Sequence, residues 1–294
     1  MEKLSERLKR PVAIVADGAI GTMLLERGLK AGDCPERMNL EQAGILEEIT
    51  GLYIEAGAVL VQTNTFGGSP LKLAQYGLEG KTEGINRSGV AVARKAAGGK
   101  AWVTASIGPS GKLLLPYGDT SAEVVFESFR RQLQAVIAEG VDLVAIETMT
   151  DLAEAVLAVK AARSVSTNVL ISASITFDAT PRGFYTIMGM TIAQAAQGLA
   201  EAGADIIGSN CGNGMAGMIS IATEFIKLSK LPVIIRSNAG LPELRNGKPI
   251  YPETPEYMAD GAKDLAKLGV RIIGGCCGTT PAHIAAIKRA VAER

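Results

Sequence analysis

The chain has 294 residues, 47% of them hydrophobic, which suits either two average domains or one α/β barrel of ~250 residues. Thirty basic and thirty acidic residues give zero formal net charge, which argues against a surface for nucleic acid or an anionic membrane. The charged N-terminal segment, the absence of an apolar run of ~20 residues and the four cysteines argue against secretion, membrane insertion and a disulfide framework. We therefore expect a cytoplasmic protein.

Short apolar runs rich in β-branched residues recur along the chain, each followed by a longer amphipathic segment. The spacing between successive runs leaves room for one helix and its loops. Near-continuous apolar runs are typical of parallel strands that are buried on both faces. We predict strands at residues 12–16, 59–64, 101–107, 143–147, 169–176, 206–211, 233–238 and 271–276.

A glycine precedes four of these strands by a residue or two. Gly57, Gly140, Gly203 and Gly269 are placed to end a helix in the left-handed conformation. Eight such alternations without a linker predict a single (β/α)₈ barrel formed by residues 1–294 as one domain. The alternative is an open doubly wound sheet, but Asp17-Gly-Ala-Ile-Gly21 lacks the glycine fingerprint expected after its first strand.

A barrel of this kind gathers its active site at the C-terminal ends of the strands. Polar residues at the predicted strand ends should therefore converge at one mouth. In chain order they are Asp17, Thr63, Asn64, Ser106, Glu147, Thr148, Asp151, Asp178, Cys211, Asn213, Asn238, Cys276 and Cys277.

The adjacent Cys276 and Cys277 follow the last strand, in Gly274-Gly-Cys-Cys-Gly-Thr-Thr280. Vicinal cysteines form only a strained disulfide, whereas two thiols at a strand end suit a soft metal. Cys211, at another strand end, offers a third ligand and leaves a fourth position of a tetrahedral zinc site open. The alternative is that these cysteines are small buried hydrophobic residues. Cys34 stands apart, and we expect it not to be a ligand.

Three thiolates neutralise the charge of zinc, which makes the ion a weak activator of water. An incoming thiol can still bind as a thiolate and stay nucleophilic at neutral pH. The cysteines therefore favour alkyl transfer to sulfur over hydrolysis, for which zinc sites more often use histidine. The single histidine, His283, is expected in the first turn of the last helix with a structural role.

Asp17 and Glu147 are candidate ligands for an ammonium group, such as that of an amino acid. The alternative is that they cap helices or anchor loop amides. Backbone amides at Gly18, Gly21 and the glycines around Asn213 are candidates for binding a carboxylate, although tight turns explain these glycines equally well.

The chain resembles the homocysteine S-methyltransferase family, and in particular the homocysteine-binding module of cobalamin-dependent methionine synthase. The resemblance rests on motifs spread over nearly the whole chain. They are Asp17-Gly-Ala-Ile-Gly-Thr22, Gln62-Thr-Asn-Thr-Phe-Gly67, Ile107-Gly-Pro109, Glu147-Thr148 with Asp151, Asn210-Cys211, Asn238-Ala-Gly-Leu-Pro242 and Gly274-Gly-Cys-Cys-Gly-Thr-Thr-Pro281.

The resemblance implies a (β/α)₈ barrel with zinc on Cys211, Cys276 and Cys277 and with homocysteine thiolate as the exchangeable ligand. Residues that match Asp17 and Glu147 contact the amino-acid end of homocysteine in family members. Asn238 matches an asparagine that approaches the metal when substrate is absent, which makes it a candidate fourth ligand.

The methyl donor differs among members of this family, which use methylcobalamin, S-methylmethionine or betaine. Betaine needs an aromatic environment for its quaternary ammonium group, and no such box is evident here. We expect methylcobalamin on a partner corrinoid protein, or S-methylmethionine. Gly212-Asn-Gly214 and Ser209 depart from the family pattern beside the metal. The alternatives are a methyltransferase of a corrinoid-protein system with another donor or acceptor, and a zinc-containing binding domain without turnover.

Overall fold

The computed structural model describes residues 1–30, 32–245 and 248–292 and contains the predicted barrel. Within these residues, eight parallel strands form one sheet in the order β1-β12-β9-β8-β5-β4-β3-β2. Ala16 and Leu60 form a parallel bridge that joins the two edge strands, β1 and β2, and so excludes an open sheet. The strands are β1 (Ile14–Val15), β2 (Leu60–Gln62), β3 (Trp102–Ile107), β4 (Leu143–Met149), β5 (Leu170–Ile175), β8 (Ile206–Asn210), β9 (Val233–Ser237) and β12 (Ile272–Gly275).

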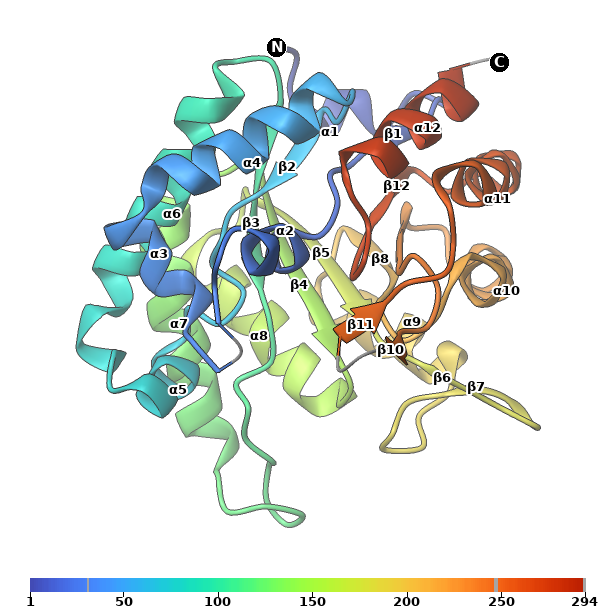
Figure 1. Ribbon diagram of the computed structural model, residues 1–294. Helices are drawn as coiled ribbons and strands as arrows, with labels where there is room; N and C mark the ends of the chain where they lie inside the picture. The colour runs from blue at the N-terminus through green and yellow to red at the C-terminus, as the bar shows by residue number, and fades with distance from the viewer. Residues whose placement is uncertain (31, 246–247, 293–294) are drawn as a thin grey trace.

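Helices surround this sheet (Figure 1). The longer ones are α2 (Ile20–Glu26), α4 (Ala43–Glu55), α6 (Thr82–Ala97), α7 (Ala122–Ala138), α8 (Leu152–Val165), α9 (Ile192–Ala202), α10 (Met215–Leu228), α11 (Pro255–Leu268) and α12 (Pro281–Ala292). Short helices are α1 (Leu4–Arg7), α3 (Met38–Glu41) and α5 (Pro70–Leu73), with 3₁₀ turns at Pro35–Arg37, Ala74–Tyr76 and Glu79–Lys81. Gly57, Gly140, Gly203 and Gly269 all have positive φ before a strand, as predicted. None of the described helices has the length and apolar character needed to span a membrane.

Two hairpins were not predicted from the sequence. They are β6–β7 (Asp178–Thr180 and Gly183–Tyr185) and β10–β11 (Glu243–Arg245 and Lys248–Ile250). Both follow the C-terminal end of a barrel strand and lie at the end of the barrel away from α1 and α12 (Figure 1). Each strand has only three residues and no continuous apolar run, so the pattern that identifies buried strands does not reveal them.

The interior of the barrel is apolar at the end where the strands begin. Leu60, Trp102, Leu143, Ile206 and other inward-facing residues form one buried cluster there, and Leu4 and Leu8 of the N-terminal segment pack against it. The alternate residues of the same strands, such as Val61 and Val103, face the helices in a second cluster. This division follows from the two-residue period of a strand.

Farther along each strand, the same inward face becomes polar. Leu60 is followed by Gln62, Leu143 leads through Ala145 to Glu147, and Ile206 leads through Gly208 to Asn210. The remaining strands add Thr104, Ser106, Ser172, Ser174 and Arg236 as buried polar residues. The C-terminal end of the barrel is therefore built to hold polar and charged groups.

Candidate metal centre and active site

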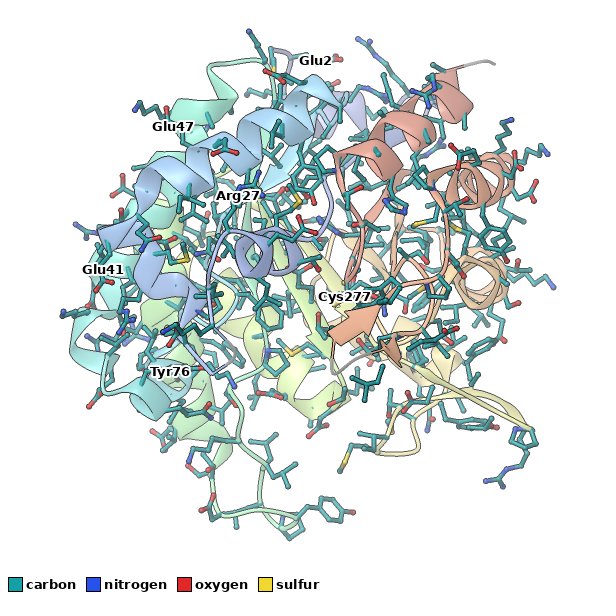
Figure 2. The ribbon with its side chains drawn as sticks, viewed as in Figure 1. Glu2, Arg27, Glu41, Glu47, Tyr76 and Cys277 are labelled. Atoms are coloured by element: carbon teal, nitrogen blue, oxygen red, sulfur yellow. The ribbon has the colours of Figure 1, made fainter. Side chains whose placement is uncertain are left out.

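Three thiols meet at the ends of β8 and β12. The Sγ atoms of Cys211, Cys276 and Cys277 all lie within 4.8 Å of one another, and those of Cys211 and Cys277 are 3.9 Å apart. A tetrahedral zinc ion with Zn–S bonds of ~2.3 Å places its sulfur ligands roughly 3.8 Å apart. The cluster therefore has the donor type and nearly the spacing of a zinc site. Cys277 lies beside β11 in the view of Figure 2.

Backbone hydrogen bonds hold the cysteine loops against the end of β9. The amide of Cys276 donates to the Ser237 carbonyl at 2.7 Å, and the amide of Ala239 donates to the Cys277 carbonyl at 3.0 Å. Gly278 turns the chain with a φ of +79°, and a Cβ there would lie 2.1 Å from the ring of Tyr251. Only glycine fits this turn, and Tyr251 thereby packs directly against the cysteine loop.

Two residues with side chains adopt a positive φ in the described structure, and both lie at this mouth. They are Thr148, with a φ of 60°, and Cys211, with a φ of 61°. Asn210 connects them: its Oδ1 accepts from the Thr148 amide at 2.8 Å, and its Nδ2 donates to Thr148 Oγ1 at 2.7 Å. Such backbone strain persists where the surroundings enforce it, which is common at functional sites.

The three thiols share their protons unequally. Hydrogen bonds from Cys276 and Cys277 lower the pKa of Cys211 far below its ordinary value, because they stabilise its thiolate. The hydrogen bond to Cys211 raises the pKa of Cys276 and also that of Cys277, the latter to about 11. The cluster alone thus favours one thiolate, and a cation that replaces the two remaining protons would convert all three thiols into ligands.

The side chain of Asn238 fits a metal site on the three cysteines. Its Oδ1 is buried without a hydrogen-bond partner among the described residues, and its side chain interacts with Cys211. A buried amide oxygen without a partner is costly and calls for an explanation. A metal ion on the three cysteines would supply the interaction that this oxygen lacks.

Glu147 is buried at the end of β4. Gln62 Nε2 donates to its Oε1 at 2.7 Å, and Ser106 Oγ donates to the same oxygen. Oε2 has no hydrogen bond within the described part of the chain, so it is free to accept from a ligand. Burial raises the pKa of Glu147, although Arg236 counteracts this effect.

Asp17 is engaged by the protein itself. Its Oδ1 accepts a hydrogen bond from Arg236 Nη2 at 2.8 Å, and its Oδ2 accepts one from the backbone amide of Gln62 at 2.7 Å. Burial raises the pKa of Asp17, and the Arg236 guanidinium opposes that rise. The two carboxylates therefore differ: Asp17 is part of a buried ion pair, whereas Glu147 retains a free oxygen.

A cavity of about 260 Å³ lies beside the cysteines. Gly18, Thr63, Asn64, Glu147 and the three clustered cysteines line it, whereas Asp17 and Asn238 lie behind its wall. Thr63 accepts a hydrogen bond from the Ser106 amide, and Asn64 donates to the Pro35 carbonyl and to Asn39, so both side chains also hold neighbouring loops.

Arg236 and Gln62 were not among the residues predicted for the site. Both belong to strands and precede the residues predicted at the strand ends, Asn238 and Thr63. A usable signal was present, since Ile234, Arg236 and Asn238 share one strand face and only the first of them is apolar. A charged residue on the inward face of a barrel strand indicates a site.

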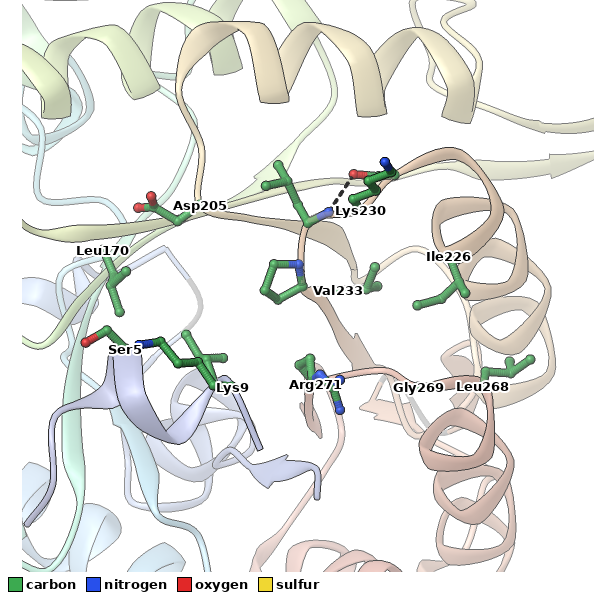
Figure 3. A pocket seen from close by; sticks show the side chains of 14 residues that line it. Ser5, Lys9, Leu170, Asp205, Ile226, Lys230, Val233, Leu268, Gly269 and Arg271 are labelled. Atoms are coloured by element: carbon green, nitrogen blue, oxygen red, sulfur yellow. Dashed lines mark hydrogen bonds between the residues drawn. The ribbon is translucent and has the colours of Figure 1, made fainter. Parts of the chain in front are cut away.

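A larger cavity of about 540 Å³ lies at the opposite end of the barrel (Figure 3). Ser5 and Lys9 line it from the N-terminal segment, together with Asp205, Lys230 and Arg271. Asp205 is already bound by Arg163 at 2.5 Å. The three clustered cysteines, Asp17 and Glu147 do not line this cavity. Although it is larger, it therefore lacks the groups expected of the active site.

Three other residues expected at the mouth do not line the cavity beside the cysteines: Asp151 caps α8, Asp178 is exposed in β6, and Asn213 donates to the Phe177 carbonyl. Two further sequence predictions concern His283 and Cys34. His283 lies in α12, where its Nδ1 is 2.9 Å from Thr280 Oγ1 and its Nε2 is 3.0 Å from the Glu253 carbonyl. These contacts fasten α12 to Thr280, just before it, and to the loop that precedes α11, which agrees with a structural role. Cys34 is buried outside the cluster and interacts with Glu36.

Comparison with known proteins places this geometry in a family. Residues 14–291 match the model of the homocysteine S-methyltransferase family. The chain is 33% identical to methionine synthase of Mycobacterium leprae and 32% identical to that of Mycobacterium tuberculosis. Both matches cover the whole chain but 25% of the relative, so the chain spans about a quarter of these proteins.

A solved structure has the same fold. The metallated form of the homocysteine methyltransferase MmuM from Escherichia coli superposes with a TM-score of 0.81, covering 97% of this chain and 99% of that one at 24% identity. Together with the match over residues 14–291, the barrel and its cysteine cluster lead to one conclusion. The chain belongs to the homocysteine S-methyltransferase family.

Proposed function

We propose that this protein is a zinc-dependent S-methyltransferase that methylates the thiol of homocysteine to give methionine. Residues 1–294 would act as one homocysteine-binding barrel. The observation that carries the proposal is the convergence of three thiols on a small cavity whose wall also holds a carboxylate with a free oxygen. Family membership supports homocysteine as the acceptor.

Cys211, Cys276 and Cys277 would hold the zinc ion, with Asn238 as the candidate fourth ligand before substrate binds. Bound zinc would lower the pKa of the acceptor thiol and keep its sulfur nucleophilic at neutral pH. The three cysteines are free thiols in the structure, and we propose a reducing cytoplasm as the compartment in which they remain so.

The carboxylate side of the cavity would orient the amino acid. Glu147 Oε2 is the oxygen available to an ammonium group, and Asp17 adds negative charge behind the wall. Gly18, Thr63 and Asn64 would shape the space around the acceptor. Fixing the amino-acid end in this way would hold the sulfur near the cysteines and in line with an incoming methyl group.

For the donor we propose methylcobalamin carried by a partner corrinoid protein. Betaine is disfavoured because Phe66 is the single aromatic residue among the described residues that line the cavity. Large apolar side chains are exposed on loops that follow β3, β5 and β9, at the same end of the barrel: Leu113, Leu115, Tyr117, Ile187, Leu241 and Leu244. An apolar rim around the mouth suits contact with another macromolecule. S-methylmethionine, a small donor, would not need this rim.

A donor panel tests the proposal. Zinc-loaded protein is incubated with homocysteine and, separately, methylcobalamin, S-methylmethionine or betaine, and methionine is measured. We expect methionine from methylcobalamin. If methionine formed only with S-methylmethionine, the proposed donor would be wrong and the proposed acceptor would stand. Turnover of a methoxylated or methylated compound with a cobalamin protein, without homocysteine binding, would favour the alternative corrinoid system. Zinc binding without any turnover would indicate a binding domain.

A further inference from the structure

Arg236 lies in the wall of the cavity, on the inward face of β9. Its side chain is 6% exposed, and it is the only cation among the described residues that line this space. Asp17 is its ion-pair partner and lies behind it. A ligand in the cavity therefore meets the guanidinium of Arg236 in the direction of Asp17.

Only two of the three guanidinium nitrogens of Arg236 form hydrogen bonds with described residues of the protein. Nε donates to the Gly275 carbonyl at 3.0 Å, and Nη2 donates to Asp17 Oδ1 at 2.8 Å, with the Asp17 and Gly18 carbonyls at 3.3 and 3.5 Å. Nη1 has no hydrogen bond to any described residue. Because the other nitrogens are anchored on the end of β12 and on the loop after β1, Nη1 is held in a fixed orientation with two N–H groups to donate.

Arg163, a partly buried arginine outside this cavity, shows what a purely structural arrangement looks like. Arg163 donates through Nε to the Gly203 carbonyl at 2.9 Å and through Nη1 to the Val169 carbonyl at 2.8 Å. Its Nη2 binds Asp205 at 2.5 Å. Every nitrogen of Arg163 is used to tie loops together, whereas Arg236 keeps one nitrogen free in the wall of a cavity.

The charges in this wall match a zwitterion. Glu147 offers a free carboxylate oxygen and Arg236 a free nitrogen, while the third charged lining residue, Glu36, is occupied by the Gly67 amide at 2.6 Å and the Cys34 thiol at 3.3 Å. The guanidinium is permanently charged, and Asp17 lies beside it as its ion-pair partner.

We propose that Arg236 binds the α-carboxylate of the acceptor through Nη1, while Glu147 binds its ammonium group. This assignment rests on the proposed function and adds the residue that recognises the acid end of the acceptor. Asp17 then acts chiefly by holding Arg236 in place. A guanidinium is well suited to this role because its charge is permanent and its donors match carboxylate geometry.

Three thiol compounds test the contacts to the carboxylate and to the ammonium group separately. They are homocysteine, 3-mercaptopropylamine, which lacks the carboxylate, and 4-mercaptobutanoate, which lacks the ammonium group. Each is titrated calorimetrically into zinc-loaded protein, so no methyl donor is needed. We expect Arg236→Met to weaken homocysteine and 4-mercaptobutanoate by about 10- to 100-fold, the loss of a charge-assisted hydrogen bond. Binding of 3-mercaptopropylamine should stay unchanged.

Arg163→Met is the matched control, since it breaks a similar arginine–aspartate pair away from the cavity, and it should change none of the three affinities. If Arg236→Met does not fold, Asp17→Asn/Arg236→Met removes the unpaired carboxylate and is tested instead. If Arg236→Met weakened the binding of all three compounds equally, or of none, the assignment of Arg236 to the carboxylate would be overturned while the proposed function would stand. Failure of the unaltered zinc-loaded protein to bind any of them would overturn the proposed function as well.

Discussion

The two ends of the barrel interior are built from the same strands and differ in what they bury. At one end Leu60, Trp102, Leu143 and their neighbours pack with Leu4 and Leu8. Two to four residues farther along, the same faces bury Gln62, Glu147 and Arg236. Burying polar groups costs free energy that burying apolar groups supplies. One end of the barrel therefore stabilises the fold, which allows the other end to hold charges in a chemically useful arrangement.

The largest effect is expected at the polar end, from Cys276→Ala. Removing one of three thiolates should abolish metal retention and lower methyl transfer by about 1,000-fold or more, because the acceptor thiol would no longer be activated. Metal content and methionine formation are measured together. Cys34→Ala is the control, since this buried thiol lies outside the cluster, and it should retain the metal. Full activity of a zinc-free Cys276→Ala protein would refute the mechanism.

At the apolar end, Leu143→Ala should act on stability. Leu143 is fully buried, and truncation of such a side chain costs about 2–5 kcal/mol of unfolding free energy through lost burial and a cavity. Denaturant unfolding measures the loss, and calorimetry should show unchanged homocysteine affinity in the folded variant. If the substitution instead weakened homocysteine binding with little loss of stability, the separation of the two ends would be wrong.

Glu147→Gln should have the opposite effect to Leu143→Ala, with weaker homocysteine binding and little change in stability. It removes the charge expected to meet the ammonium group, and homocysteine should bind about 10- to 100-fold more weakly, with little loss of stability near neutral pH. Glu154→Gln is a matched control, because Glu154 is also buried but binds Ser110 outside the cavity. Equal effects of the two substitutions on homocysteine affinity would contradict a role in recognition.

The smallest effect we expect is a change in pH dependence. Burial raises the pKa of Glu147 above its ordinary value of 4.5. The folded protein therefore holds this proton more tightly than the unfolded chain, so the contribution of Glu147 to stability is fully present below pH 4.5 and is lost as pH rises through the folded-state pKa. Unfolding of Glu147→Gln, followed from pH 4.5 upward, should decline less steeply than that of the unaltered protein. An unchanged slope would contradict the raised pKa.

The fold was predictable because each barrel strand carries its own apolar run and four of the strands follow a glycine that ends the preceding helix. The cysteine cluster was predictable because its residue types are rare and lie at strand ends. The inward position of Arg236 could have been read from its strand face, but its pairing with Asp17 could not, since this contact joins β9 to the end of β1 across β12 and no local pattern encodes it.

The central claim is that zinc on the three cysteines binds the acceptor sulfur as a thiolate. Calorimetric titration of homocysteine into zinc-loaded and zinc-free protein, in buffers of different ionisation enthalpy, counts the protons released on binding. The account predicts tight binding with release of about one proton at neutral pH in the presence of zinc, and weak binding without it. Equally tight binding without zinc, or binding to zinc-loaded protein with no proton release, would contradict it.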